Sequence, residues 1–123
     1  MHALVVDDSS TMRMILREFL KKLGFEVAEA GNGQEALDCL KGTAKVDLVL
    51  VDWNMPVMDG VSFVRAVRAD PSYADLPLMM VTTNAELSQV ATALEAGANE
   101  YIMKPFTRQM IREKLELLGF LPV

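Results

Sequence analysis

Carboxylate side chains follow two short apolar runs of this 123-residue chain, at the point where each run ends. Asp7 and Asp8 follow residues 3–6, and Asp52 follows residues 48–51, directly before a proline- and glycine-containing segment that predicts a turn. The carboxyl ends of strands in an open α/β sheet are where such folds bind their ligands. We therefore interpret the three aspartates as one acidic site, with Asp52 as its reactive member.

A cation is needed to keep these carboxylates together. Neighbouring carboxylates repel one another, and each would have a raised pKa unless a positive charge lay between them. No histidine or thiol accompanies them, so the site offers only oxygen ligands, which favours Mg²⁺ over Zn²⁺. Lys104 follows another apolar run, and together with one Mg²⁺ it formally balances the three carboxylates. This balance favours a site that receives an incoming anion.

The hydroxyl of Thr82 follows the run at residues 78–81 and completes the set. A carboxylate nucleophile can form an acyl-phosphate, and Mg²⁺ with a lysine would neutralise the phosphoryl oxygens. Each residue alone has an ordinary reading: a turn or helix cap for an aspartate, a strand-end hydroxyl for Thr82, and a surface charge for Lys104. Four strand ends that all carry the required groups jointly predict a phosphoryl-accepting site at Asp52.

Strand-like and helix-like patterns alternate along the chain and place these residues. The apolar runs are nearly continuous, as in strands that are covered on both faces. They lie at residues 3–6, 27–30, 48–51, 78–81 and 101–103. Between them apolar residues recur at helical spacing, with a cap at Asn32 and helix starts near Asp59 and Thr107. Five βα units predict an α/β fold, a doubly wound five-stranded parallel sheet with helices on both faces.

Composition limits the class of protein. A chain of 123 residues that is 51% hydrophobic predicts a single domain over residues 1–123, with no appended output domain. We find no candidate membrane span or signal peptide, and the lone Cys39 fits a reducing cytoplasm. The net charge of −5 argues against binding to nucleic acid. We expect a cytoplasmic monomer.

The chain is similar to response-regulator receiver domains across nearly its whole length. The similarity is carried by residues 5–13, 52–60, 81–82 and 101–107. Among receivers, it most resembles the single-domain regulators of bacterial chemotaxis. The resemblance implies a flavodoxin-like fold with the strand order 2-1-3-4-5.

The resemblance also implies the role of each residue in the acidic site. Asp52 would accept a phosphoryl group from the phosphohistidine of a sensor histidine kinase (CheA-like). Asp8 and Asp52 would bind Mg²⁺ directly and Asp7 through water, and the main-chain carbonyl of Asn54 would add one more oxygen. Lys104 would contact the phosphoryl group.

The same resemblance implies further residues that would transmit the effect of phosphorylation. Thr82 would move to bind the phosphoryl group, with Thr83 beside it. Tyr101 would turn inward as Thr82 moves, which would change the outer surface of the fourth helix, fifth strand and fifth helix. A cis peptide bond would precede Pro105.

The last predicted helix carries Arg108, Arg112 and Lys114, which either form a basic docking edge or are ordinary solvated charges. By resemblance, the partners of such a face would be a flagellar motor switch protein and a phosphatase. The same acidic site would equally serve a phosphorelay intermediate or a regulator of another pathway.

Two other classes of protein fit the sequence poorly. An aspartate-nucleophile phosphatase needs Asp-x-Asp after its first strand, whereas Asp7 and Asp8 are adjacent. A flavin binder needs a hydroxyl- and glycine-rich loop at that position, where this acidic pair would repel a phosphate. The sequence therefore predicts a signalling switch, not an enzyme.

Thr83 and Trp53, two residues beside the site, allow further predictions. Thr83 stands where many receivers have a small residue such as alanine, and its bulk would crowd the path of a hydrolytic water towards phosphorylated Asp52. We therefore expect a longer-lived phosphoryl group than alanine would allow. Trp53 adjoins Asp52; we interpret it as a packing residue and a built-in fluorescent reporter.

Overall fold

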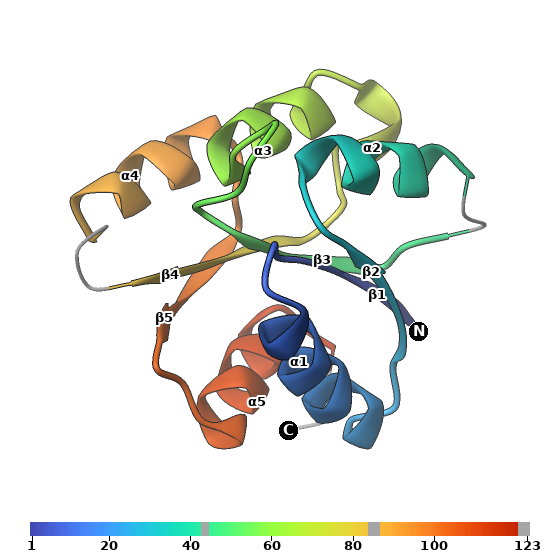
Figure 1. The fold of residues 1–123 in the computed structure, drawn as a ribbon, viewed down its shortest axis with the longest axis vertical. Coiled ribbons are helices and arrows are strands. Elements are labelled where there is room, and N and C mark those ends of the chain that lie inside the picture. Colours follow the sequence, from blue (N-terminus) through green and yellow to red (C-terminus); the bar gives the residue numbers. More distant parts are fainter. Residues whose placement is uncertain (43–44, 84–86, 121–123) are drawn as a thin grey trace.

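A parallel sheet of five strands separates two layers of helices (Figure 1). The structure is a computed structural model that describes residues 1–42, 45–83 and 87–120. Its elements are β1 (His2–Val6), α1 (Ser10–Lys22), β2 (Glu26–Ala30), α2 (Gly33–Gly42), β3 (Leu48–Asp52), α3 (Gly60–Arg68), the 3₁₀ turn η1 (Pro71–Tyr73), β4 (Leu78–Thr83), α4 (Leu87–Ala96), β5 (Glu100–Lys104) and α5 (Arg108–Leu117). Helices α1 and α5 cover one face of the sheet, and α2, α3 and α4 cover the other (Figure 1). Within the described ranges, no helix is long and apolar enough to cross a membrane.

The strand order is β2-β1-β3-β4-β5, which confirms the order implied by the family resemblance. The chain runs outward from β1 to β2 and then returns to β3, so the order reverses between β1 and β3. In open α/β sheets, such a reversal leaves a crevice at the carboxyl ends of the two central strands. The predicted acidic site lies at this position.

Burial explains why the three central strands read as apolar runs. Every residue of β3 is buried, because helices pack against both of its faces. Strands β4 and β5 extend beyond the predicted runs, since the parallel ladder continues to the pair Thr83 and Lys104. Asp52 and Lys104 are therefore the last residues of their strands, and Thr82 lies inside β4.

Side-chain caps determine where the loops end and the helices begin. Asn32, Asp59 and Thr107 each accept a hydrogen bond from the backbone N–H three residues later, at 2.8–3.1 Å. These are the three predicted helix starts, and all are confirmed. Ser9 caps α1 in the same way at 3.2 Å. The loops at the carboxyl edge of the sheet are thus fixed at their helical ends.

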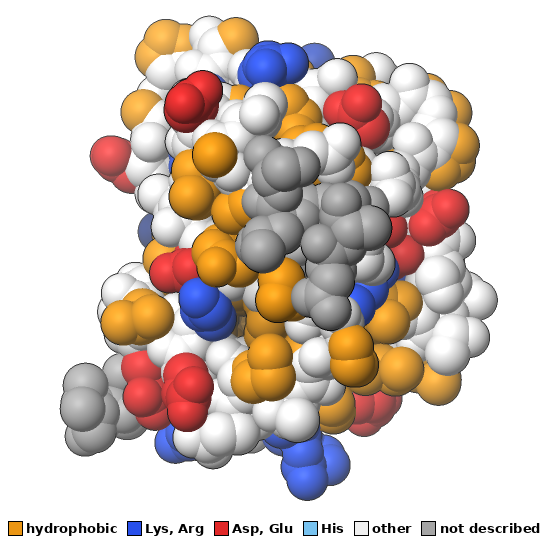
Figure 2. Space-filling view, turned by 90° about the vertical axis from the view of Figure 1, so that its left-hand side faces the viewer, with side chains coloured by type: hydrophobic (Ala, Val, Ile, Leu, Met, Phe, Trp, Pro, Cys, Tyr) orange, Lys and Arg blue, Asp and Glu red, His pale blue; other side chains and the backbone are white. Residues whose placement is uncertain are grey.

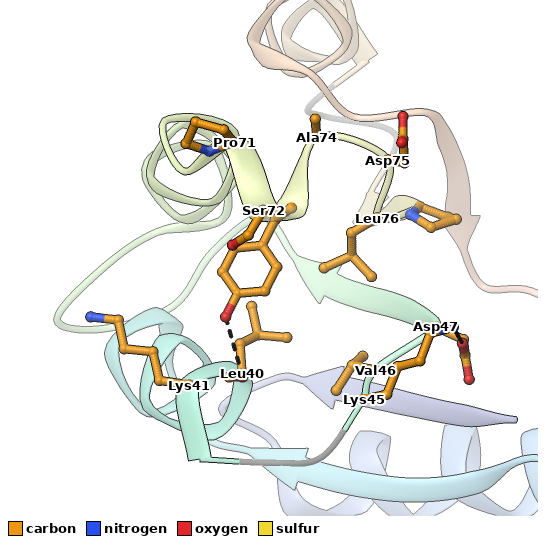
Figure 3. Close-up of a pocket in the computed structure, with 12 residues that line it drawn as sticks. Leu40, Lys41, Lys45, Val46, Asp47, Pro71, Ser72, Ala74, Asp75 and Leu76 are labelled. Atoms are coloured by element: carbon orange, nitrogen blue, oxygen red, sulfur yellow. Dashed lines mark hydrogen bonds and ion pairs between the residues drawn. The ribbon is translucent and has the colours of Figure 1, made fainter.

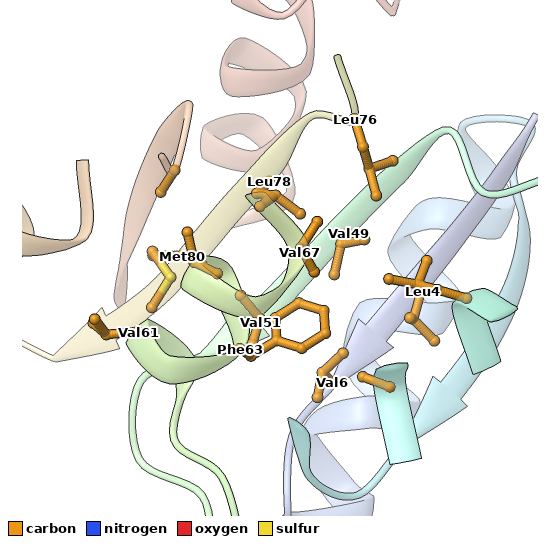
Figure 4. Close-up of a cluster of buried hydrophobic side chains, with 14 of the residues drawn as sticks. Leu4, Val6, Val49, Val51, Val61, Phe63, Val67, Leu76, Leu78 and Met80 are labelled. Atoms are coloured by element: carbon orange, nitrogen blue, oxygen red, sulfur yellow. The ribbon is translucent and has the colours of Figure 1, made fainter. Parts of the chain in front are cut away.

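The hydrophobic core consists of two clusters, one on each face of the sheet. In the cluster beneath α2, α3 and α4, the fully buried Phe63 points from α3 towards the sheet, where Val6 and Val51 lie (Figure 4). These two valines precede Asp7 and Asp52 directly. The same packing that stabilises the fold therefore holds the strand ends of the acidic site.

Truncation of Phe63 should destabilise the fold strongly. Phe63→Ala removes a fully buried ring, and such changes lower the free energy of unfolding by about 3–5 kcal/mol. Urea denaturation measures this loss. The matched control is Leu117→Ala, at a position where the side chain is 73% exposed and where the expected loss is below about 1 kcal/mol. Equal losses in the two variants would contradict the assignment of the core.

Candidate functional site

The register of the sheet brings the three predicted aspartates together. Val6 of β1 pairs with Val51 of β3, so the residues that follow them are neighbours. One carboxylate oxygen from each of Asp7, Asp8 and Asp52 lies within 4.8 Å of the other two. Asp7 is 1% exposed and Asp52 is 8% exposed, whereas Asp8 faces solvent. The site is thus a mostly buried acidic cluster that meets solvent at Asp8, and we refer to it as the acidic pocket.

Backbone and side-chain hydrogen bonds hold Asp7 in place. Its carboxylate accepts from the N–H of Ser9 at 2.9 Å, and its own N–H donates to the carbonyl of Ala30 at 3.1 Å. The guanidinium of Arg13 donates to the carbonyl of Asp7 at 2.6 Å. Sequence reasoning missed both Ser9 and Arg13. A serine just before the helical pattern is a recognisable cap signal, but Arg13 looks like any charged residue on a helix surface.

Lys104 reaches the pocket from the carboxyl end of β5. Its Nζ lies 3.3 Å from a carboxylate oxygen of Asp52 and 3.4 Å from one of Asp7. The Lys104–Pro105 peptide bond is cis, as the resemblance implied. One ammonium group therefore bridges two carboxylates that belong to different strands.

The charges of the pocket are not balanced by Lys104 alone. Burial and, next, repulsion by Asp7 raise the pKa of Asp52 from 3.8 to about 6, although the neighbouring Lys104 lowers it. A divalent cation would relieve this repulsion. The aspartates offer only oxygen donors, and in the described part of the chain no histidine or cysteine joins their cluster. This donor set fits a hard cation such as Mg²⁺.

The predicted switch residues lie on the two adjacent strands β4 and β5. Thr82 is buried, and its hydroxyl donates to the carbonyl of Thr83 at 3.5 Å, whereas Thr83 is exposed. The ring of Tyr101 is half-buried, with the ammonium group of Lys114 at 4.8 Å from its centroid. Lys114 also forms an ion pair of 2.8 Å with Glu100.

The three basic residues predicted for a docking edge do not lie along one edge. Arg108 lies over the ring of Phe19 at 6.0 Å, and Arg112 pairs with Glu116 at 3.5 Å. Both arginines line a hollow of about 390 Å³ between α1 and α5, whereas Lys114 turns towards β5. Figure 2 views the protein from the side of β5, where hydrophobic side chains gather in the middle of the face.

The loop after β3 carries the remaining predicted residues. Trp53 is half-buried and packs against the core, in agreement with its interpretation as a packing residue. Asn54 is exposed, and the role of its carbonyl as a metal ligand stays a prediction.

A separate hollow of about 620 Å³ lies at the opposite edge of the sheet (Figure 3). It is lined by residues from the end of α2, from η1 and from the segments that enter β3 and β4. The hydroxyl of Tyr73 donates across it to the carbonyl of Leu40 at 3.2 Å. None of the residues of the acidic pocket lines this hollow, so its size does not bear on the chemistry.

Replacement of Asp52 by asparagine should stabilise the metal-free fold at neutral pH. In the folded protein the pKa of Asp52 is about 6, above the unfolded value of 3.8. The stability that protonated Asp52 provides is therefore complete below pH 3.8 and is lost as the pH rises through 6. Asparagine cannot ionise, so Asp52→Asn should gain about 3 kcal/mol over the wild type by roughly pH 8. Urea denaturation in a chelator, as a function of pH, measures the gap. The exposed Asp38→Asn serves as control, and a gap for Asp52→Asn that does not widen with pH would contradict the prediction.

A family model described as the response regulator receiver domain matches residues 3–116. Among curated relatives, the chemotaxis protein CheY1 of Helicobacter pylori is 49% identical over 119 residues, and the match covers 96% of each chain. The identity extends over the whole fold and is not limited to the acidic pocket.

Solved structures agree with this relationship. The chemotaxis response regulator CheY4 of Vibrio cholerae has a TM-score of 0.88 at 34% identity, covering 95% of this chain and 97% of that one. The receiver domain of the sensor histidine kinase PA1611 from Pseudomonas aeruginosa, which has a magnesium ion coordinated in its active site cleft, has a TM-score of 0.84 at 29% identity and covers 94% of each chain. With its sheet order and its acidic pocket, this chain belongs to the response-regulator receiver family, and within that family it is CheY-like.

Proposed function

We propose that this chain is a response regulator in which Asp52 accepts a phosphoryl group from a histidine kinase. The observation that carries the proposal is the charge arrangement in the pocket. Three carboxylates converge within 4.8 Å, and the ammonium group of Lys104, from another strand, lies 3.3 Å from the carboxylate of Asp52. Such a site attracts a cation first. The cation and the lysine can then bind an anion jointly.

The transfer uses the Asp52 carboxylate as nucleophile. An oxygen of Asp52 forms a bond to phosphorus while the P–N bond of the phosphohistidine breaks. The imidazole nitrogen keeps the electron pair of that bond and takes up a proton as it leaves. A bound Mg²⁺ supplies positive charge that offsets the phosphoryl oxygens. Asp7, Asp8, Asp52 and the carbonyl of Asn54 would hold this ion.

The remaining residues respond to the new charge. Phosphorylation converts the Asp52 carboxylate into an acyl-phosphate, so Lys104 exchanges a carboxylate contact for a phosphoryl oxygen. Thr82 lies in β4, between the strands of Asp52 and Lys104, and would donate its hydroxyl to the same group. Tyr101 lies on the adjacent edge strand, and its turn inward would change the α4–β5–α5 face. The result is a switch that acts only on its own phosphorylation state.

The names of the relatives favour chemotaxis as the pathway. The partners would then be a CheA-like kinase, a flagellar motor switch protein and a phosphatase, all reached by a cytoplasmic monomer. A phosphorelay intermediate or a regulator of another pathway would use the same pocket. Identification of the protein that binds only the phosphorylated form separates these alternatives.

Trp53 fluorescence should report both ligands of the pocket. The indole adjoins Asp52 in sequence and is half-buried, so Mg²⁺ and then acetyl phosphate should change its emission. Asp52→Asn should lose the acetyl phosphate response and weaken Mg²⁺ binding by about tenfold, because one ligand charge is removed. The control Asp38→Asn should keep both responses. A wild-type protein that responds to neither ligand would refute the proposed function.

Thr83→Ala should lose its phosphoryl group several-fold faster than the wild type, because the smaller side chain opens a path for water to the acyl-phosphate. The measurement is phosphate release after removal of the donor, with Mg²⁺ present throughout. Thr92→Ala, an exposed threonine on α4, is the control and should match the wild type. An unchanged or slower release from Thr83→Ala would show that Thr83 does not shield the site.

A further inference from the structure

The loop between β3 and α3 contains a backbone conformation that its sequence disfavours. Val57 has φ of +69°, and in the described part of the chain it is the one non-glycine residue with a positive φ. The N–H of Met58 donates to the carbonyl of Pro56 at 2.7 Å, so Val57 is the central residue of a γ-turn. This form of the turn is rare and strained, and for a β-branched residue a positive φ is a genuine outlier.

The neighbours of Val57 hold the loop in this conformation. Met58 is half-buried against the core and lies so close to Gly33 that a Cβ there would meet Met58 Cγ at 2.8 Å. Asp59 caps α3, and the N–H of Gly60 donates to the carbonyl of Trp53 at 3.0 Å, which closes the base of the loop. The turn is therefore fixed on both sides of Val57.

The constrained loop presents an apolar side chain to solvent. Val57 is 82% exposed, and it lies five residues after Asp52 in the loop that leaves the acidic pocket. Asparagine, aspartate or glycine would adopt this conformation with less strain and would also suit the exposure. Neither local conformation nor solvation accounts for a valine here, and strained residues held by their surroundings cluster at functional sites.

We propose that Val57 is a contact residue for the protein that donates the phosphoryl group. The inference rests on the proposed function, because a donor that places a phosphohistidine above Asp52 must cover the rim of the pocket. Val57 is exposed on the loop that follows Asp52, so its isopropyl group would be buried against an apolar part of the donor surface. A small phosphodonor has no such surface, so Val57 would distinguish protein donors from small molecules while the chemistry at Asp52 stays the same.

The test compares two donors that both break a P–N bond. One is phosphoramidate. The other is the phosphorylated histidine phosphotransfer domain of a chemotaxis kinase from Helicobacter pylori, chosen beforehand for its transfer to the wild-type protein. Val57→Thr keeps the shape of the side chain and its strain but removes apolar surface. Val57→Asn removes the apolar surface and tolerates the positive φ.

Both variants should accept the phosphoryl group from the protein donor about tenfold more slowly, and from phosphoramidate within about twofold of the wild-type rate. Val57→Asn should also raise the melting temperature by about 3–6 °C, because backbone strain is relieved. The matched control is Leu117→Gln, an exposed leucine near the end of α5, which should change neither rate.

The outcomes separate the inference from the proposed function. Wild-type rates from the protein donor in both Val57 variants would overturn the inference and leave the proposed function intact. Equal slowing with both donors would also overturn it, because Val57 would then act on the pocket itself. A wild-type protein that takes up no phosphoryl group from phosphoramidate or from any kinase domain would overturn the proposed function as well.

Discussion

Repulsion between buried carboxylates is the constraint on which the site depends. Asp7 and Asp52 are almost fully buried, and Lys104 is the ammonium group that contacts both. Carboxylates this close would separate if their backbones were free to move. They stay together because the strands that carry them are paired and are packed on both faces by apolar side chains. The core therefore maintains an electrostatically unfavourable pocket, and any added positive charge would stabilise it.

A second unfavourable feature lies in the loop that follows Asp52. Burial raises the pKa of Asp52, and Val57 holds a disfavoured backbone conformation a few residues later. Both features lower stability locally, and the contacts of Met58, Asp59 and Gly60 hold the loop in its conformation. The acidic pocket and the loop after β3 thus lower the stability of the fold, and the core beneath them compensates for this loss. Such an arrangement is common at functional sites.

Two neighbouring strands, β4 and β5, connect the acidic pocket with the outer face of the protein. Lys104 ends β5, and Tyr101 lies on the same strand beside β4, which carries Thr82. On the outside, Lys114 lies over the Tyr101 ring and pairs with Glu100. A shift of Lys104 towards a phosphoryl group would therefore act on a strand whose outer side chains are already in contact with α5. The residues that we propose sense phosphorylation therefore lie on two paired strands, next to the face that we propose responds.

The sequence by itself determined which residues lie at the same edge of the sheet. Apolar runs indicate strands buried on both faces, the alternation with helices makes the strands parallel, and parallel strands end at one edge, where Asp7, Asp52 and Lys104 are expected. The strand order that makes them neighbours was implied by the family resemblance and is confirmed by the sheet. Only the tertiary structure decided the contact of Arg13 with the Asp7 backbone, the separation of Lys114 from the arginines of α5, and the positive φ of Val57. A sequence pattern reports burial and periodicity, which are local. Side-chain partners and strained turns depend on how segments distant in the chain pack against one another.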